Sequence, residues 1–222
     1  MSKRDPPAII VVTYEGDNAA PQLVLDALDR RGAESWRLDS DRFPLDIRLS
    51  MVAISEQSTL STPAGAVPLD RLRSVWVRRL AIAHALPTDD EPGVREASVA
   101  ESRLSMRAWL DGLDVRVMDR PSIVDGARDK MRQLRVARDV GMAVPATLLS
   151  NDPEQVRRFA AELQGAVVAK MLHPFALGSP DDERVVFTSP VRPEDLADLA
   201  GLSRSPMVFQ QAIRSVVELR VT

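Results

Sequence analysis

The stretch Ile9-Ile10-Val11-Val12-Thr13 determines the fold class of this chain. It is an unbroken run of β-branched residues, which is typical of a parallel strand that is buried on both faces. A polar loop follows, in which Asp17 or Asn18 is placed to cap a helix over residues 20–31. Gly32 stands where that helix should end, because glycine readily adopts the left-handed backbone of a helix terminus.

The pattern continues as an open α/β domain with a parallel sheet, which we place at residues 1–120. A strand predicted over residues 34–38 completes a βαβ unit, which implies parallel pairing. The remaining predicted elements of this domain are strands within 45–60, over 74–79 and over 115–118, and a helix over 94–110.

Two arginines, Arg78 and Arg79, stand at the carboxyl end of the predicted strand 74–79. Open α/β sheets bind ligands at the carboxyl ends of their strands. We therefore take Arg78 and Arg79 as candidates for binding an anionic group of a substrate, while exposed structural arginines would give the same pattern.

Composition excludes several classes of protein. The 222 residues contain no cysteine and two histidines, so disulfides, thiolate metal sites and cysteine nucleophiles are excluded. The formal net charge is −3, which gives no electrostatic footprint for nucleic acid. No apolar run reaches the roughly 18–20 residues of a membrane span, and the apolar run from Ile9 to Val12 is too short for the hydrophobic region of a signal peptide. We expect a cytoplasmic protein without membrane or nucleic-acid partners.

A second domain is predicted over residues 121–222, with a central lobe at about 145–213. A single helix is expected from Asp125 to Val140. The other predicted elements are helices over 151–163 and from 193, and strands over 144–149, 166–171, 185–188, 207–213 and 216–222. The last strand ends without a turn or cap, which indicates a truncated protein, although a short edge strand would look the same.

Only three of the 29 basic residues are lysines, namely Lys3, Lys130 and Lys170. Lysine offers a compact ammonium on a flexible stem, whereas arginine offers a planar fork. Lys130 opens a predicted helix and Lys170 closes a predicted strand about forty positions later. A chain that otherwise uses arginine has a reason to keep each internal lysine, with codon bias and chance as the alternative explanation.

Five stretches, in this order along the chain, resemble ATP-grasp ribosomal peptide maturases, the graspetide synthetases of the microviridin-ligase type. They are Arg37-Leu38-Asp39-Ser40-Asp41-Arg42-Phe43-Pro44, Val75-Trp76-Val77-Arg78-Arg79, Asp129-Lys130-Met131-Arg132-Gln133-Leu134, Val167-Val168-Ala169-Lys170 and residues 209–222. The resemblance implies a pre-ATP-grasp domain with an open parallel sheet, followed by an incomplete ATP-grasp domain that contains a small α+β lobe and the start of the large sheet.

The resemblance also implies a nucleotide site. Lys130 and Lys170 would bind the phosphates of ATP, and the backbone of Gln210 and Gln211 would meet adenine. Ile213 would pack on the adenine ring. Glu218 would accept hydrogen bonds from the ribose, and Arg220 would act as the catalytic residue, facing the γ-phosphate or the acidic substrate side chain. A cross-strand or surface ion pair between Glu218 and Arg220 stays an alternative.

In the family, ATP activates a Glu or Asp side chain of a precursor peptide as an acyl phosphate, and a Ser, Thr or Lys side chain attacks it. The product is a side-chain ester or amide macrocycle. The resemblance therefore predicts a ligase that uses ATP and Mg²⁺, with the metal ligands beyond residue 222. It places the leader of the peptide on Glu194, Asp195 and Asp198, although acidic residues at a helix N-terminus are also favoured by the helix dipole.

Three points stay open at the level of sequence. One alternative is a general ATP-grasp carboxylate–amine ligase of the glutamate-adding type. Another is a non-catalytic peptide-binding module, which applies if the chain really ends at Thr222, since this chain alone is then expected to be inactive. A homodimer is also compatible with the sequence.

Overall fold

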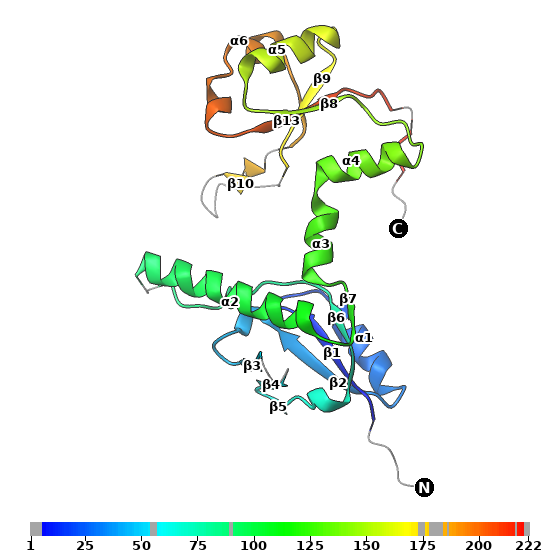
Figure 1. Ribbon diagram of the computed structural model, residues 1–222, viewed down its shortest axis with the longest axis vertical. Helices are drawn as coiled ribbons and strands as arrows, with labels where there is room; N and C mark the ends of the chain where they lie inside the picture. Colours follow the sequence, from blue (N-terminus) through cyan, green and yellow to red (C-terminus); the bar gives the residue numbers. More distant parts are fainter. Residues whose placement is uncertain are drawn as a thin grey trace. The chain divides into compact units, whose positions relative to one another are not determined.

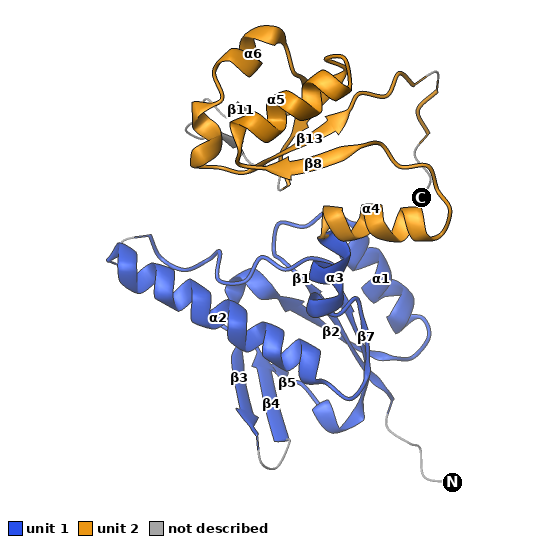
Figure 2. Cartoon of the chain, turned by 45° about the horizontal axis from the view of Figure 1, so that its top comes forward, with its two compact units in different colours: residues 1–128 blue, residues 129–222 orange. Residues whose placement is uncertain are grey.

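The computed structural model describes residues 6–53, 57–88, 91–172, 176–177, 184–185, 187–215 and 217–219, with only the backbone described at 176–177 and 184–185. The chain divides into two compact units, residues 1–128 and 129–222 (Figure 2). This division falls eight residues after the boundary expected from the sequence, because the helix that follows Arg120 belongs with the first unit.

Unit 1 contains a parallel sheet and a smaller antiparallel sheet (Figure 1). Its strands are β1 (Ala8–Thr13), β2 (Glu34–Asp39), β3 (Arg48–Val52), β4 (Gln57–Thr62), β5 (Gly65–Ala66), β6 (Leu72–Val77) and β7 (Arg116–Met118). Its helices are α1 (Ala20–Asp29), α2 (Pro92–Gly112) and α3 (Pro121–Arg128), with 3-10 turns η1 (Ser40–Arg42) and η2 (Leu69–Arg71).

The parallel sheet has the strand order β2-β1-β6-β7, so β1 lies inside it as predicted. Successive side chains of a strand point to opposite faces. Ile10 and Val12 join the core cluster with Met106 and Trp109 of α2, while Val11 is also fully buried. The strand is therefore buried on both faces, which is why its sequence is apolar throughout.

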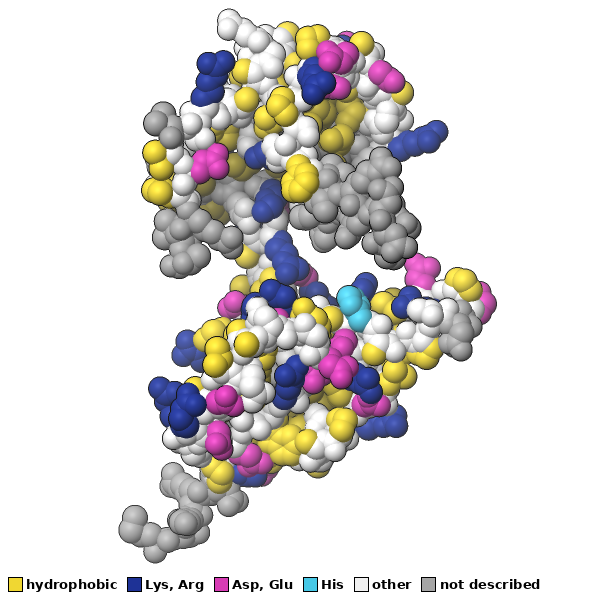
Figure 3. All heavy atoms as spheres, turned by 180° about the vertical axis from the view of Figure 1, so that it is seen from behind, with side chains coloured by type: hydrophobic (Ala, Val, Ile, Leu, Met, Phe, Trp, Pro, Cys, Tyr) yellow, Lys and Arg dark blue, Asp and Glu magenta, His cyan; other side chains and the backbone are white. Residues whose placement is uncertain are grey.

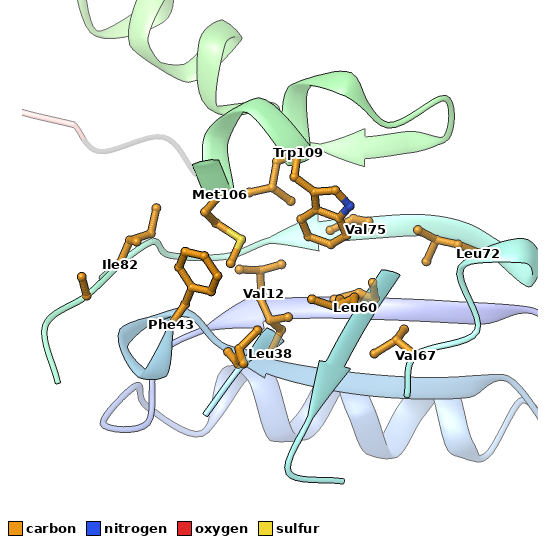
Figure 4. Close-up of a cluster of buried hydrophobic side chains, with 14 residues drawn as sticks. Val12, Leu38, Phe43, Leu60, Val67, Leu72, Val75, Ile82, Met106 and Trp109 are labelled. Atoms are coloured by element: carbon orange, nitrogen blue, oxygen red, sulfur yellow. The ribbon is translucent and has the colours of Figure 1, made fainter. Parts of the chain in front are cut away.

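The core of unit 1 fills the space between the parallel sheet, α2 and the antiparallel sheet β3-β4-β5 (Figure 4). Leu60 from β4 and Phe43 after η1 enter the same cluster. Burying side chains of this size contributes about 1.5–3 kcal/mol each. The antiparallel strands thus complete the hydrophobic core. Strands β3 and β4 correspond to the one or two strands predicted within residues 45–60, while β5 was not predicted.

Unit 2 contains a four-stranded antiparallel sheet with the order β12-β9-β13-β8. Its strands are β8 (Thr147–Ser150), β9 (Val167–Lys170), β12 (Ser189–Pro190) and β13 (Met207–Gln211), and a separate two-stranded ladder pairs β10 (Ala176–Leu177) with β11 (Arg184–Val185). Its helices are α4 (Lys130–Asp139), α5 (Pro153–Glu162) and α6 (Pro193–Ala197), with the 3-10 turn η3 (Ala200–Ser203).

Helix α5 covers one face of this sheet, as Figure 2 shows. Val156 and Ala160 of α5 pack with Val167 and Phe209 of the sheet and with Leu202 of η3. Asp152 caps α5 by accepting hydrogen bonds from the backbone N–H groups of the first turn. The small α+β lobe predicted from the sequence therefore has its own hydrophobic core.

Two predicted helix boundaries differ from the structure. The single helix expected from Asp125 to Val140 is divided into α3 and α4. The division occurs because Asp129 has an extended backbone and caps α4, accepting from the N–H groups of Met131 at 2.9 Å and Arg132 at 3.0 Å. The helix cap predicted at Asp17 or Asn18 is met in part: the N-cap position of α1 is Ala19, but Asn18 Oδ1 accepts from the N–H of Ala20, the first residue of α1, at 3.0 Å.

The strand predicted over residues 216–222 is wrong where it can be compared. Val217, Glu218 and Leu219 are exposed and are not in a strand. A strand needs a neighbouring strand to satisfy its backbone, and alternation of side chains alone does not supply one. Residue 216 and residues 220–222, with the predicted catalytic Arg220, lie outside the described residues.

Candidate functional site

The face of the unit 2 sheet opposite α5 carries a row of polar side chains. The register pairs Phe209 with Leu148 and Ala169, and these three side chains pack toward α5. Alternation places Gln210 on the other face together with Thr147, and Lys170 lies on that same face. Gln210 and Gln211 therefore lie on opposite faces of the sheet, so Gln210 shares a face with Lys170 and Gln211 does not.

Lys170 and Gln210, both predicted from the sequence, are brought into direct contact. The ammonium of Lys170 donates a hydrogen bond to the side-chain oxygen of Gln210. Gln210 Nε2 in turn donates to Thr147 Oγ1 at 2.8 Å. All three side chains are half-buried. A lysine held in this way keeps a positive charge within reach of a ligand on this face.

The backbone of β13 is already engaged by its neighbours. The Gln211 N–H donates to the Ala146 carbonyl at 2.9 Å, and the Ala212 N–H donates to the Ala166 carbonyl at 2.8 Å. Gln211 Oε1 also accepts from the Ala146 N–H at 3.4 Å. These N–H groups therefore support the sheet.

The other residues predicted for the nucleotide are exposed. Ile213 is 68% exposed. Glu218 is exposed and accepts a hydrogen bond from Ser215 Oγ at 3.0 Å. Lys130 is the exposed first residue of α4, and in the described ranges no hydrogen bond or ion pair joins it to the Lys170 row. Convergence of the two lysines on one phosphate chain thus remains a prediction.

The three acidic residues predicted for a peptide leader lie at and just after α6. Asp195 caps α6 by accepting from the Arg192 N–H at 2.8 Å. Glu194 is exposed and lies 3.7 Å from Arg192 Nη1. Asp198 accepts from the Ala200 N–H at 3.2 Å. Asp195 and Asp198 therefore have local structural roles, and Glu194 has the greatest freedom to meet a partner.

The carboxyl edge of the unit 1 sheet holds Arg78 and Arg79, as predicted from the strand before them. The backbone N–H groups of both donate to the Val12 carbonyl, at 2.9 and 3.5 Å. Arg79 Nη1 lies 3.4 Å from Asp17 Oδ1 and donates to Tyr14 Oη at 3.4 Å. The side chain of Arg78 has no hydrogen bond or ion pair with any residue described, so Arg78 is the better candidate for binding an anion.

Asp17 pairs with Arg79 at this edge of the sheet, and the sequence did not predict this contact. Its carboxylate is fully buried and accepts from Thr13 Oγ1 at 2.7 Å. That hydrogen bond, together with the Asn18 N–H and the charges of Arg79 and Arg78, holds the pKa of Asp17 below its usual value of 3.8, although burial acts in the opposite direction. The Asp17 carboxylate therefore neutralises part of the arginine pair.

Replacing Asp17 by asparagine is expected to remove a pH-dependent part of the stability of unit 1. Because the pKa of Asp17 is lowered in the folded state, its carboxylate stabilises the fold above the usual value of 3.8, and this stabilisation is lost as the pH falls through the lower folded-state value. The difference in free energy of unfolding between wild type and Asp17→Asn should thus be largest at neutral pH and shrink as the pH falls below about 4.

Urea unfolding at a series of pH values measures this difference. All three tryptophans lie in unit 1, so their fluorescence reports on this unit. Asp29→Asn, at the end of α1, serves as the control for loss of an exposed charge. A difference between wild type and Asp17→Asn that stays constant from neutral to acidic pH would contradict the prediction.

The stretch from Arg37 to Pro44 anchors the same edge. Ser40 is fully buried, donates from Oγ to the Thr13 carbonyl at 2.7 Å and accepts from the Ala81 N–H at 3.0 Å. Arg37 donates to Asp39 Oδ1 at 2.8 Å and to the Tyr14 carbonyl at 3.1 Å. Beside it lies a pocket of about 400 Å³, which is lined by Glu15, Arg37, Asp39, Arg42, Asp46, Ile47 and residues 62–64. This stretch ties the ends of β1 and β2 to the loop after β6.

Charges are mixed over the surface. On the face shown in Figure 3, basic and acidic side chains are interspersed over both units. Among the described residues, no cluster of three or more acidic or histidine side chains could hold a metal ion. The helices of the described ranges include none that is long and apolar enough to cross a membrane.

Comparison with known proteins identifies the family. The family model for the MvdD pre-ATP grasp domain matches residues 8–125. The macrocyclase MdnC from Microcystis aeruginosa MRC, solved with its precursor peptide MdnA, is 38% identical with a TM-score of 0.86, over 93% of this chain and 68% of that one. No curated protein sequence matches the chain.

Two further solved structures are similar. A Chryseobacterium gregarium RiPP-associated ATP-grasp ligase, in complex with ADP and a leader and core peptide, is 31% identical with a TM-score of 0.82, over 92% of this chain and 62% of that one. The ATP-grasp ligase PsnB, complexed with a minimal precursor, Mg and ADP, is 27% identical with a TM-score of 0.64, over 93% and 65% of the two chains. This chain thus spans about two thirds of the length of these proteins.

These matches confirm the resemblance drawn from the five sequence stretches and the fold class expected from it, with the pre-ATP-grasp sheet in unit 1 and part of an ATP-grasp domain in unit 2. Since the family model covers more than half of the chain, and MdnC is 38% identical to it over the matched region, the chain belongs to the family of RiPP ATP-grasp macrocyclases.

Proposed function

We propose that the protein is an ATP-dependent ligase that closes side-chain ester or amide rings in a ribosomal precursor peptide. The observation that carries the proposal is the match to MdnC over 93% of this chain, in a structure that contains a precursor peptide. Similar ligases were solved with ADP, with Mg and ADP, and with leader and core peptides. The position of Lys170 on the sheet face opposite α5 is consistent with a phosphate-binding role.

The proposed reaction has two steps. A carboxylate of the peptide attacks the γ-phosphorus of ATP, so that an acyl phosphate forms and ADP leaves. A Ser or Thr hydroxyl or a Lys amine then attacks the acyl carbon, loses a proton and expels phosphate. Catalysis of phosphoryl transfer depends mainly on positioning and on neutralising charge, which suits lysine and arginine side chains.

In this proposal Lys170 and Lys130 bind phosphate oxygens, and Ile213 packs against adenine. Because the N–H groups of Gln211 and Ala212 are engaged within the sheet, a backbone donor to adenine would come from Ile213 or beyond. Glu218 is proposed for the ribose and Arg220 for the γ-phosphate or the acidic side chain. The described residues offer no metal cluster, so we assign no Mg²⁺ ligand among them.

Arg78 and Arg79 are proposed to meet the acidic side chains of the peptide. Arg78 is expected to contribute more to peptide binding than Arg79, because Arg79 is already paired with Asp17. Arginine suits this role, since its planar fork matches the two oxygens of a carboxylate. The acidic residues at and after α6 are proposed to meet a basic leader.

Mass spectrometry tests the proposed function. The protein is incubated with ATP, Mg²⁺ and a precursor peptide encoded beside its gene. Ring closure lowers the peptide mass by one water per ring, whereas a glutamate-adding ligase would raise the mass of its acceptor. ATP-dependent loss of water from the peptide supports the proposal. An unchanged peptide mass, with the peptide shown to bind, would favour a peptide-binding module instead.

Charge reversal at α6 tests the leader contact. Glu194→Lys leaves the Asp195 cap intact and is expected to weaken binding of a basic leader about three- to tenfold, while the affinity for an ATP analogue stays unchanged. Glu162→Lys, at the exposed end of α5, is the matched control. Equal leader affinity for wild type and Glu194→Lys, measured by calorimetry, would remove this helix from the proposal.

A further inference from the structure

Three hydrogen bonds run in sequence across β9, β13 and β8. Lys170 Nζ donates to Gln210 Oε1, and Gln210 Nε2 donates to Thr147 Oγ1 at 2.8 Å. Thr147 Oγ1 then donates to the Pro145 carbonyl at 2.9 Å. The contacts follow from the register, because Thr147 is directly opposite Gln210, and Lys170 is opposite Val208, two residues before Gln210.

This chain of hydrogen bonds has a single direction. An ammonium can only donate and a backbone carbonyl can only accept, whereas an amide and a hydroxyl can do both. The oxygen of Gln210 must therefore face Lys170, and its NH₂ group must face Thr147. The hydroxyl of Thr147 accepts from Gln210 and gives its proton to Pro145. Both ends are fixed, so the orientation of the Gln210 amide is fixed as well.

A neutral partner is well suited to a phosphate-binding lysine. The ammonium has three N–H donors, of which Gln210 uses one. The amide carries no charge, so it orients Lys170 without neutralising it, as a carboxylate would. Among the described residues, no carboxylate forms an ion pair with Lys170. Holding a flexible side chain in advance also reduces the entropy that is lost when a ligand binds.

We infer that Gln210 is a positioning residue that holds the Lys170 ammonium for the phosphates of the nucleotide, and that Thr147 fixes the orientation of Gln210. This inference rests on the proposed function, because it requires a nucleotide at Lys170. It assigns the side chain of Gln210 to the phosphate end of the ligand, and not to the base.

A series of nucleotides distinguishes these two assignments. Binding of adenosine, AMP, ADP and a non-hydrolysable ATP analogue is measured for wild type and for Gln210→Met. If Gln210 positions Lys170, the affinity for adenosine is unchanged, while the affinities for ADP and the ATP analogue fall about three- to tenfold. A loss of equal size for all four ligands would make Gln210 a contact to the base and would overturn the inference.

Thr147 provides a matched pair of variants. Thr147→Val keeps the shape of the side chain but removes its hydroxyl, and we expect it to weaken ADP binding with the same dependence on phosphate. Thr147→Ser keeps the hydroxyl and is expected to restore most of the affinity. This pair also carries the test if Gln210→Met does not fold. Equal ADP affinities for Thr147→Val and Thr147→Ser would exclude the role of Thr147.

A double-mutant cycle completes the test. In a Lys170→Met background, Gln210→Met should have no further effect on ADP affinity, since its effect is transmitted through the lysine. Independent, additive losses would contradict the inference. If wild type binds no adenine nucleotide, the proposed function and the inference both fail. If wild type binds ADP and Lys170→Met weakens binding, but Gln210→Met matches wild type, only the inference fails.

Discussion

Replacing Trp109 by alanine is expected to lower the free energy of unfolding of unit 1 by about 3–5 kcal/mol. The indole is only 2% exposed and lies in the core cluster that α2 forms with the parallel sheet (Figure 4). Truncation would leave a large cavity at the centre of this cluster, where interlocked strands and helix cannot collapse to fill it. Urea unfolding measures the change, because Trp36 and Trp76 still report on unit 1.

Replacing Trp109 by phenylalanine is expected to cost much less than alanine. The indole Nε1 is buried, and no hydrogen-bond partner is found for it in the part of the chain that is described. An unpaired buried N–H costs about 1–3 kcal/mol, which phenylalanine removes while keeping most of the ring. Leu104→Ala, at a position of α2 that is 63% exposed, should change stability by about 0.5 kcal/mol at most. Equal losses for phenylalanine and alanine would contradict this prediction.

Replacing Lys170 by methionine is expected to weaken the binding of ADP or an ATP analogue by about 10- to 100-fold, with the fold retained. A hydrogen bond from a charged donor contributes about 1.5–3 kcal/mol, which corresponds to this range. Methionine keeps a long apolar side chain on β9 and removes only the charge and its donors. Calorimetry gives the affinities, and circular dichroism checks the fold.

Arg158→Met is the matched control for the loss of a cation. Arg158 is exposed on α5, the helix that packs on the opposite face of the same sheet. We expect its replacement to leave nucleotide affinity unchanged. Wild-type affinity in Lys170→Met would remove Lys170 from the nucleotide site, while an equal loss in both variants would indicate a general effect of charge.

The sequence predicted the positions of individual site residues better than the contacts between them. The apolar run of β1, the strand before Arg78 and the short strand ending at Lys170 were predicted, because burial on both faces and strand ends leave local signatures. Thr147 was missed, since its partnership with Gln210 depends on the register of β8 against β13, which no local pattern encodes. The role of Asp17 was missed for a similar reason, because its partner Arg79 lies more than sixty residues away.

The sequence by itself determined most of the longer strands and helices, the parallel βαβ start of unit 1 and the resemblance to the macrocyclase family, since periodicity and short motifs are local properties. It did not determine that Asp129 divides one helix into two, or that residues 217–219 stay outside a strand. Only the tertiary structure decided which side of the sheet each glutamine faces and which arginine is already paired. These choices depend on contacts between segments far apart in the chain, and such contacts form only when the backbone register and the packing are fixed together.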